Sequence, residues 1–189
     1  LCSLAAYVFT RLEFKGRNIV FILYLSTMMI PITVRLIPSY NLCRNLNMLD
    51  TYMGMILPQV AWSIPFGTFL MRQFYMGIPK QLDEAAKIDG ANHFQIFWKI
   101  LLPNTKSSMT TLGIYTFISA WNNLIWMLLS VRSESKWTVT LGISSICGAS
   151  VIKQPTWNLI MGVIVIGMIP VLILFFAFQK YFMQSVAAT

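Results

Sequence analysis

Few side chains in this 189-residue chain could do chemistry, and most of them gather in one short segment. Asp83, Glu84, Asp89 and His93, the only histidine, lie within residues 83–93. No cysteine joins them at metal-ligand spacing, and the sequence has no Gly-rich phosphate loop ending in Lys-Ser/Thr. The three cysteines are scattered and are predicted to pack as small apolar side chains. The segment therefore predicts a recognition surface, with no metal site and no catalytic nucleophile.

The elements that position these residues are predicted to be two short helices. Residues 78–90 favour a helix in which Pro79 takes the first helical position and Gly90 forms a left-handed C-terminal cap. Acids at its start and Lys87 near its end suit the helix dipole. Asn92 and Gln95 then form a capping-box pattern for a second helix that ends before Pro103. An apolar stripe at helical spacing runs through both helices: Leu82, Ala85, Phe94, Phe97 and Leu101.

This pair of amphipathic helices could lie on a membrane surface or dock into a groove of a partner protein. The small residues Ala85 and Ala86, beside Glu84, would allow another backbone to approach closely. We expect Glu84 to form a salt bridge with such a partner. Asp89 either serves the turn internally or touches the partner, and His93 is expected to be an exposed helix residue.

The composition excludes an ordinary soluble domain. Hydrophobic residues make up 57% of the chain and charged residues only 11%, whereas soluble domains carry about 25% charged residues. Uncharged runs cover residues 18–34, 51–71, 107–131 and 154–179. A membrane-spanning helix needs about 20 apolar residues, which the last three runs supply directly. The first run would suffice if Arg35 snorkels to an interface.

The sequence therefore predicts an all-α integral membrane protein with a single polytopic domain over residues 1–189. Spans are expected at about 19–38, 52–71, 107–130 and 157–179, with residues 1–10 forming part of another. Because the chain begins with an apolar stretch too short to span, we expect it to be N-terminally truncated, with further residues encoded before Leu1.

The basic residues set the predicted orientation. Nine Lys/Arg lie at residues 11–17, 72–106 and 180, whereas four lie at residue 44 and within 132–153. The positive-inside rule then places the loop 76–105 in the cytoplasm and the polar loop 132–155 outside. It also explains the net charge of +8 without nucleic-acid binding.

Polar and aromatic residues within the spans are candidates for a solute pathway. Amides in hydrocarbon are costly unless they face a bundle or a cavity, and aromatic rings beside amides suit sugars. Hydrogen bonding between helices is the alternative for the same residues. The candidates are Trp121, Asn122, Asn123, Trp126, Gln59 and Trp62.

The loop resembles the EAA loop in the membrane subunits of binding-protein-dependent ABC importers. Glu84-Ala85-Ala86, three residues, Gly90, nine residues and Ile100-Leu101-Leu102-Pro103 match the pattern E-A-A-x3-G-x9-I-x-L-P. The stretch 84–91 is similar to the maltose-type, carbohydrate branch, and the resemblance covers nearly the whole chain. Two features depart from the family pattern: its first one and a half spans are absent, and the tail 184–189 is atypical.

The resemblance implies the helical bundle of a type I ABC importer permease in the cytoplasmic membrane of a bacterium or archaeon. It implies a non-enzymatic subunit that forms part of a sugar pathway. Its partners would be membrane lipid, a homologous second permease, two ATPase subunits that bind ATP and Mg, and an extracytoplasmic solute-binding protein. The implied coupling residues are Glu84, Ala85, Ala86, Asp89, Gly90 and Pro103.

Three alternatives differ in class or substrate. The same architecture could import another solute, such as glycerol phosphate or an acidic oligosaccharide. An intramembrane enzyme would need paired acids or a Ser/His pair within a span, and the three longest uncharged runs contain no charge and no histidine. A structural assembly subunit would not require the EAA spacing.

Overall fold

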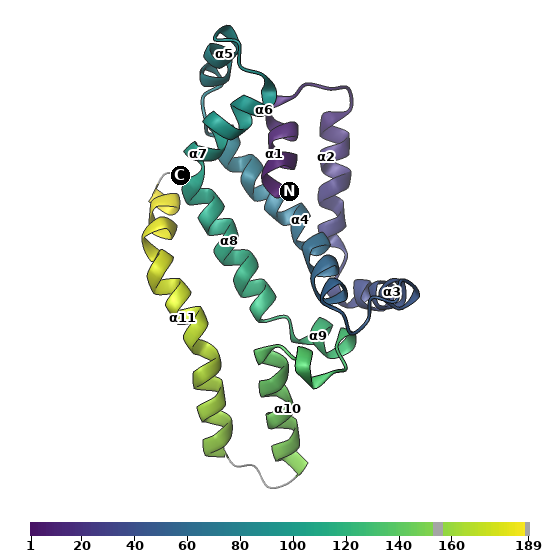
Figure 1. The fold of residues 1–189 in the computed structure, drawn as a ribbon. Coiled ribbons are helices and arrows are strands. Elements are labelled where there is room, and N and C mark those ends of the chain that lie inside the picture. The colour runs from purple at the N-terminus through teal and green to yellow at the C-terminus, as the bar shows by residue number, and fades with distance from the viewer. Residues whose placement is uncertain (153–156, 188–189) are drawn as a thin grey trace. The chain divides into compact units, whose positions relative to one another are not determined.

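All regular secondary structure in the described backbone is helical (Figure 1). The computed structural model describes residues 1–152 and 157–187, with side chains described for residues 1–148 and 157–179. A helix satisfies its backbone hydrogen bonds internally, which a bilayer requires because it offers no water as a partner. The predicted all-α integral membrane fold is confirmed.

Contacts within the chain divide it into two compact units. The first comprises Leu1–Pro31, Ala61–Gly113 and Tyr181–Thr189, and the second comprises Ile32–Val60 and Ile114–Lys180. Three helices contribute residues to both units: α4 (Tyr52–Met76), α8 (Lys106–Trp121) and α11 (Trp157–Ala187). The remaining helices of the first unit are α1 (Cys2–Arg11), α2 (Arg17–Ser26), the 3-10 turn η1 (Thr27–Met29), α5 (Gln81–Ile88), α6 (His93–Ile96), the π turn η2 (Phe97–Leu101) and α7 (Leu102–Asn104).

The second unit holds α3 (Ile32–Asn45), α9 (Leu124–Ser130), the 3-10 turn η3 (Glu134–Lys136), α10 (Val139–Ile152) and α11 as far as Lys180. Helices α10 and α11 approach closely at Gly167, where a Cβ would lie 2.5 Å from Ile143 Cδ1. The atypical tail at 184–189 lies outside the residues whose side chains are described, as do the loop residues 153–156.

Two helices in the described residues are long and apolar enough to cross a membrane, Tyr52–Met76 and Trp157–Gln179. Two bent helix pairs raise the number to four if each pair is one span. The prediction of an uninterrupted helix over 19–38 is wrong, because α2 and η1 end before Pro31 and α3 begins at Ile32. Pro31 has no N–H, and it holds Ile30 in an extended conformation (ψ 117°). Arg35 therefore lies in the first turns of α3.

The uninterrupted helix predicted over 107–130 is also wrong. Helix α8 ends at Trp121, and α9 begins after Asn123 with its axis turned by 54°. The Asn123 side chain accepts a hydrogen bond from Trp126 N at 3.3 Å and so caps α9. Asparagine competes with helical hydrogen bonds and favours such caps, which accounts for the break.

The polar loop predicted over 132–155 is wrong over most of its length, because α10 occupies Val139–Ile152. This helix has 14 residues, fewer than the about 20 apolar residues that a membrane-spanning helix needs. Helix α4 is longer than the predicted 52–71 and continues to Met76.

The hydrophobic core of the first unit joins the loop helices to the long helices. Its buried side chains come from α1, α4, α5, α8 and the segment 96–101. Because α5, α6 and the π turn all contribute, the loop is anchored as a packed body. The core residues are Ala6, Tyr7, Met71, Tyr75, Ala86, Ile96, Phe97, Leu101 and Leu112.

Candidate functional site

Helix α5 has one face in the core of the first unit and one face uncovered. Asp83 and Ala86, three residues apart, are buried. Glu84 and Ala85 are exposed on the other side. Of the predicted coupling residues, Ala86 therefore packs within its own chain, while Glu84 and Ala85 are free to meet a partner.

The apolar stripe predicted along both helices is divided in the structure. Phe97 and Leu101 are buried in the core, whereas Leu82, Ala85 and Phe94 are exposed. Ile88 is 87% exposed and Phe94 is 66% exposed. Exposed apolar side chains gathered on one loop indicate a contact surface. We call the exposed set Leu82, Glu84, Ala85, Ile88, Phe94 and Trp98 the coupling surface.

The turn between α5 and α6 forms as predicted. Gly90 has φ +83°, and its N–H donates to Lys87 O at 3.0 Å. Ala91 N donates to Ala86 O at 2.9 Å, which completes a Schellman motif. Ala86 and Ala91 also contribute to the same apolar cluster, as that motif favours. The predicted start at Pro79 is wrong by two residues, because α5 begins at Gln81 after Lys80.

Asn92, the residue after Ala91, is the N-cap of α6. Asn92 Oδ1 accepts from Gln95 N at 2.8 Å, and Gln95 Oε1 accepts from Asn92 N at 2.9 Å. This is the predicted capping box. The Schellman motif and the capping box therefore follow each other with no spare residue between them. Asp89, the residue before Gly90, is exposed at the end of α5.

Gly90→Val should destabilise this turn by about 2 kcal/mol, because a β-branched residue resists positive φ. Open space surrounds the site, with no atom within 4 Å of an added Cβ, so the cost is conformational. Asparagine tolerates left-handed φ, and Gly90→Asn is the matched control. Hydrogen exchange of residues 81–96 measures the difference. Equal protection in both variants would contradict the role of Gly90.

The predicted end of the second loop helix before Pro103 is wrong. Leu102 N donates to Phe97 O, five residues earlier, which widens the helix into a π turn. The backbone then continues through α7, with exposed Pro103 inside it. The Leu101 carbonyl accepts from both Thr105 N at 3.1 Å and Thr105 Oγ1 at 3.0 Å. Pro103 therefore follows the π turn inside α7 and does not end the helical backbone.

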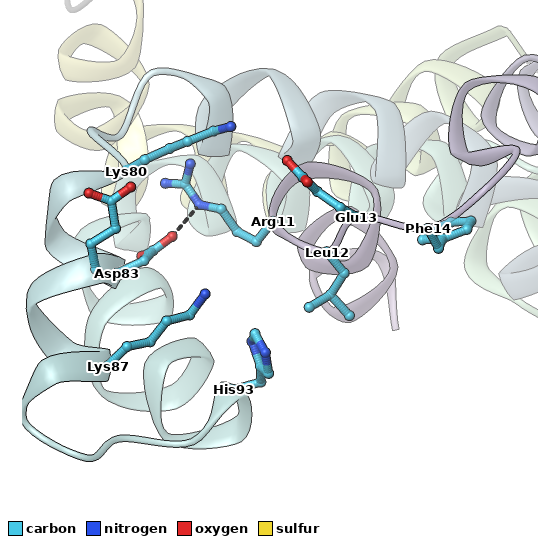
Figure 2. Close-up of a pocket in the computed structure, with 9 residues that line it drawn as sticks. Arg11, Leu12, Glu13, Phe14, Lys80, Asp83, Lys87 and His93 are labelled. Carbon is cyan, nitrogen blue, oxygen red and sulfur yellow. Dashed lines mark ion pairs between the residues drawn. The ribbon is translucent and has the colours of Figure 1, made fainter.

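Arg11, at the end of α1, holds the buried face of α5. Its Nε lies 2.7 Å from Asp83 Oδ2, and the two side chains are only 5% and 10% exposed (Figure 2). Its Nη2 donates to Ile78 O at 2.9 Å. Burial raises the pKa of Asp83, and the Arg11 guanidinium opposes that rise. We call the Arg11–Asp83 pair the α1 clamp.

A second contact joins α1 to α6. Tyr7 OH lies 3.0 Å from Nδ1 of His93, which is exposed as predicted. A recess of about 570 Å³ lies between these elements, and its lining includes Arg11, Lys80, Asp83 and Lys87 (Figure 2). Sequence reasoning missed both contacts, because no local pattern pairs α1 with a distant loop.

The structure brings four of the pathway candidates together at the break between α8 and α9. Trp121 O accepts from Thr140 Oγ1 at 2.5 Å, and Asn122 is exposed. Trp126 is fully buried and donates through Nε1 to Gly54 O at 3.1 Å. Its ring therefore supports the break. Gln59 and Trp62 lie three residues apart on α4, on one partly exposed face.

Sequence reasoning also missed Asp50, which ties two loops of the second unit together. Asp50 Oδ1 accepts from the backbone N–H groups of Arg132 (3.1 Å) and Ser133 (3.0 Å). Hydrogen bonds from Ser133 and Arg132, with Lys136 nearby, hold the pKa of Asp50 well below its usual range. These contacts connect the end of the α3–α4 loop to the start of η3.

Comparisons with known proteins agree with this arrangement. The family model described as "Binding-protein-dependent transport system inner membrane component" matches residues 2–188. The sn-glycerol-3-phosphate transport system permease protein UgpE of Yersinia enterocolitica is 38% identical over 96% of this chain. The arabinooligosaccharides transport system permease protein AraQ of Bacillus subtilis is 34% identical over 97% of it. The chain spans 64% and 63% of the lengths of these two relatives.

A solved structure shares the fold. A chain of a bacterial ABC transporter involved in the import of the acidic polysaccharide alginate superposes with a TM-score of 0.75 at 27% identity. The match covers 96% of this chain and 69% of that one. With the helical membrane fold and the exposed, doubly capped loop, these matches identify the family. The chain belongs to the inner membrane components of binding-protein-dependent transport systems.

Proposed function

We propose that this chain is a permease subunit of an ATP-driven importer and that the coupling surface docks on an ATPase subunit. The observation that carries the proposal is the division of α5 into two faces. One face is fixed to α1 through the α1 clamp, and the other leaves Glu84, Ala85 and Ile88 exposed. Because α5 is fixed to α1, a displacement of the loop by a docked partner would be transmitted to α1.

The partners of the proposal follow from the family. A second, homologous permease completes the pathway, two ATPase subunits bind ATP and Mg, and an extracytoplasmic binding protein delivers the solute. ATP binding would close the ATPase pair and move each docked loop. This subunit would catalyse no reaction itself. Its loop and α1 would move together, because Arg11 and Tyr7 of α1 both contact the loop.

A sugar is the substrate class that we propose, and sn-glycerol 3-phosphate is the second candidate. Support for sugars comes from the arabinooligosaccharide relative and from the amides and aromatic rings at the break after Trp121. Support for the second candidate comes from the 38% identical relative. Uptake of labelled oligosaccharides and of labelled glycerol phosphate into vesicles, with the adjacent subunits co-expressed, distinguishes them.

The coupling surface should tolerate no charge reversal at Glu84. Glu84→Lys places a cation where we expect a basic side chain of the ATPase. The repulsion should weaken the binding free energy by about 2 kcal/mol, or the affinity roughly thirtyfold. Co-purification of the ATPase in detergent and uptake into vesicles should both fall. Glu134→Lys makes the same charge change on exposed η3 and should leave both unchanged. An intact complex with normal uptake in Glu84→Lys would refute the proposal.

We also propose that the loop between α4 and α8 lies in the cytoplasm, in the cytoplasmic membrane of a bacterium or archaeon. Cysteine labelling with an impermeant reagent in intact cells checks this orientation. Ser135→Cys should react, and Ile88→Cys should react only after lysis. Both positions are exposed, whereas the neighbouring Asp83 is buried and unsuitable as a probe. The background lacks Cys2, Cys43 and Cys147, and the reverse pattern would invert the orientation.

A further inference from the structure

A second pocket of the first unit has four cations as the charged side chains of its lining. It has a volume of about 370 Å³, within the range of ligand sites, and lies between the ends of α1 and α4 and the start of α2. Arg11, Arg17, Arg72 and Lys80 line it, and no carboxylate from the described part of the chain does. Four cations around one pocket predict an anionic ligand.

The arginines are held in place by contacts that leave most of their charge uncompensated. The Arg72 guanidinium lies over the Phe21 ring at 4.4 Å, and its buried Nε has no hydrogen-bond partner among the described residues. Arg17 Nη1 donates to Leu12 O at 3.3 Å. This backbone carbonyl is uncharged and does not neutralise the guanidinium. Of the four cations, Arg11 alone has an anionic partner among the residues whose side chains are described, Asp83 of the α1 clamp. Arg17, Arg72 and Lys80 therefore give the pocket a net positive charge.

The surroundings of the pocket are apolar on one side. Phe9 and Met76 share its lining, and Met76 is exposed. Helix α2 begins at Arg17 and at once presents exposed apolar residues along its length: Ile19, Val20, Ile22 and Leu23. The cations thus lie where a polar loop gives way to a helix with exposed apolar side chains. A ligand that suits both parts has an anionic head and a long apolar tail.

We propose that this pocket binds the phosphate group of an anionic phospholipid, with its acyl chains along α2. Arginine and lysine clusters at the end of a spanning helix attract such headgroups. Arginine also matches phosphate oxygens with two parallel N–H donors. The orientation proposed above would place the lipid in the cytoplasmic leaflet, but the pocket itself does not depend on the transport function.

The test is native mass spectrometry of the full chain, purified from membranes in detergent with any subunits that accompany it. Phosphatidylglycerol and phosphatidylcholine are titrated separately, and inorganic phosphate is added as a third arm. Arg17→Gln/Lys80→Gln removes two cations and keeps the Arg72–Phe21 contact. Lys15→Gln/Lys99→Gln is the matched control, because it makes the same change in net charge at exposed residues outside the pocket.

Removing a cation should weaken phosphatidylglycerol binding roughly fivefold, so the pocket variant should bind roughly 25-fold more weakly than the control. Phosphatidylcholine should bind weakly to all forms, and millimolar inorganic phosphate should not displace phosphatidylglycerol. Equal affinity in the pocket variant and the control would overturn the site. Displacement by inorganic phosphate, or equal binding of phosphatidylcholine, would overturn the assignment to an anionic lipid. These outcomes leave the ATPase-docking proposal untouched, because its test reads co-purification of a different partner.

Discussion

Arg11→Ala should loosen the coupling loop and nearly abolish uptake. The substitution leaves the Asp83 carboxylate buried without its cation, and breaking a buried pair in this way costs about 3–5 kcal/mol. The Ile78 carbonyl loses its hydrogen bond from the same side chain. We expect faster hydrogen exchange in α5 and uptake near background, while the ATPase still binds the intact coupling surface.

The pH dependence of this variant follows from Asp83. Burial raises the pKa of that carboxyl, and removing Arg11 takes away the group that opposes the rise. A raised pKa in the folded state means that stability is fully present below the unfolded value, about 3.9, and is lost as pH rises through the folded value. The Arg11→Ala protein should therefore be more stable at pH 5 than at pH 8, by thermal unfolding in detergent.

The double variant Arg11→Ala/Asp83→Ala provides the control. It removes the unpaired carboxylate as well, so it should recover part of the stability that Arg11→Ala loses. It should also lose the pH dependence. Two results would contradict the α1 clamp: wild-type exchange rates in Arg11→Ala, or a double variant whose loss equals the sum of the single losses.

Gly54→Ala should destabilise the second unit severely. An added Cβ would lie 2.0 Å from Met48 O and 2.9 Å from Met48 C, both backbone atoms that cannot rotate away. The Gly54 carbonyl also accepts the hydrogen bond from the buried Trp126 ring. Relief requires the α3–α4 loop to move, and we expect a loss of about 3 kcal/mol or more.

Gly162→Ala on α11 is the matched control, because no atom lies within 4 Å of its added Cβ. It should be neutral or stabilise by roughly 0.5–1 kcal/mol, as alanine for glycine does inside a helix. Thermal unfolding in detergent and the yield of folded protein measure both variants. If Gly54→Ala unfolds at the wild-type temperature, the close approach of Met48 is not present in the protein.

The sequence predicted well those features that depend on neighbouring residues. Gly90 and the Asn92–Gln95 pair could be assigned because their hydrogen bonds close within a few residues. The helix breaks were missed because charge spacing measures only the length of an apolar run. Pro31 and Asn122–Asn123 interrupt such runs without adding charge, and α10 is uncharged but short.

Contacts between distant segments could not be predicted at all. Asp83 was assigned to the helix dipole, whereas in the structure it pairs with Arg11 from α1. Asp50, in the loop between α3 and α4, accepts hydrogen bonds from Arg132 and Ser133, about 80 residues later in the chain. In both cases the residue type was visible in the sequence, but its partner is set by the tertiary fold.

The π turn at Phe97–Leu101 has a consequence at the level of the gene. A π turn holds one residue more than the α turn that it replaces. In a regular α-helix the extra residue would rotate α7 and the start of α8 by about 100° relative to α6, whereas the wide π turn absorbs it. The angular setting between the coupling surface and α8 is thus encoded by the number of codons in this segment as well as by their identities.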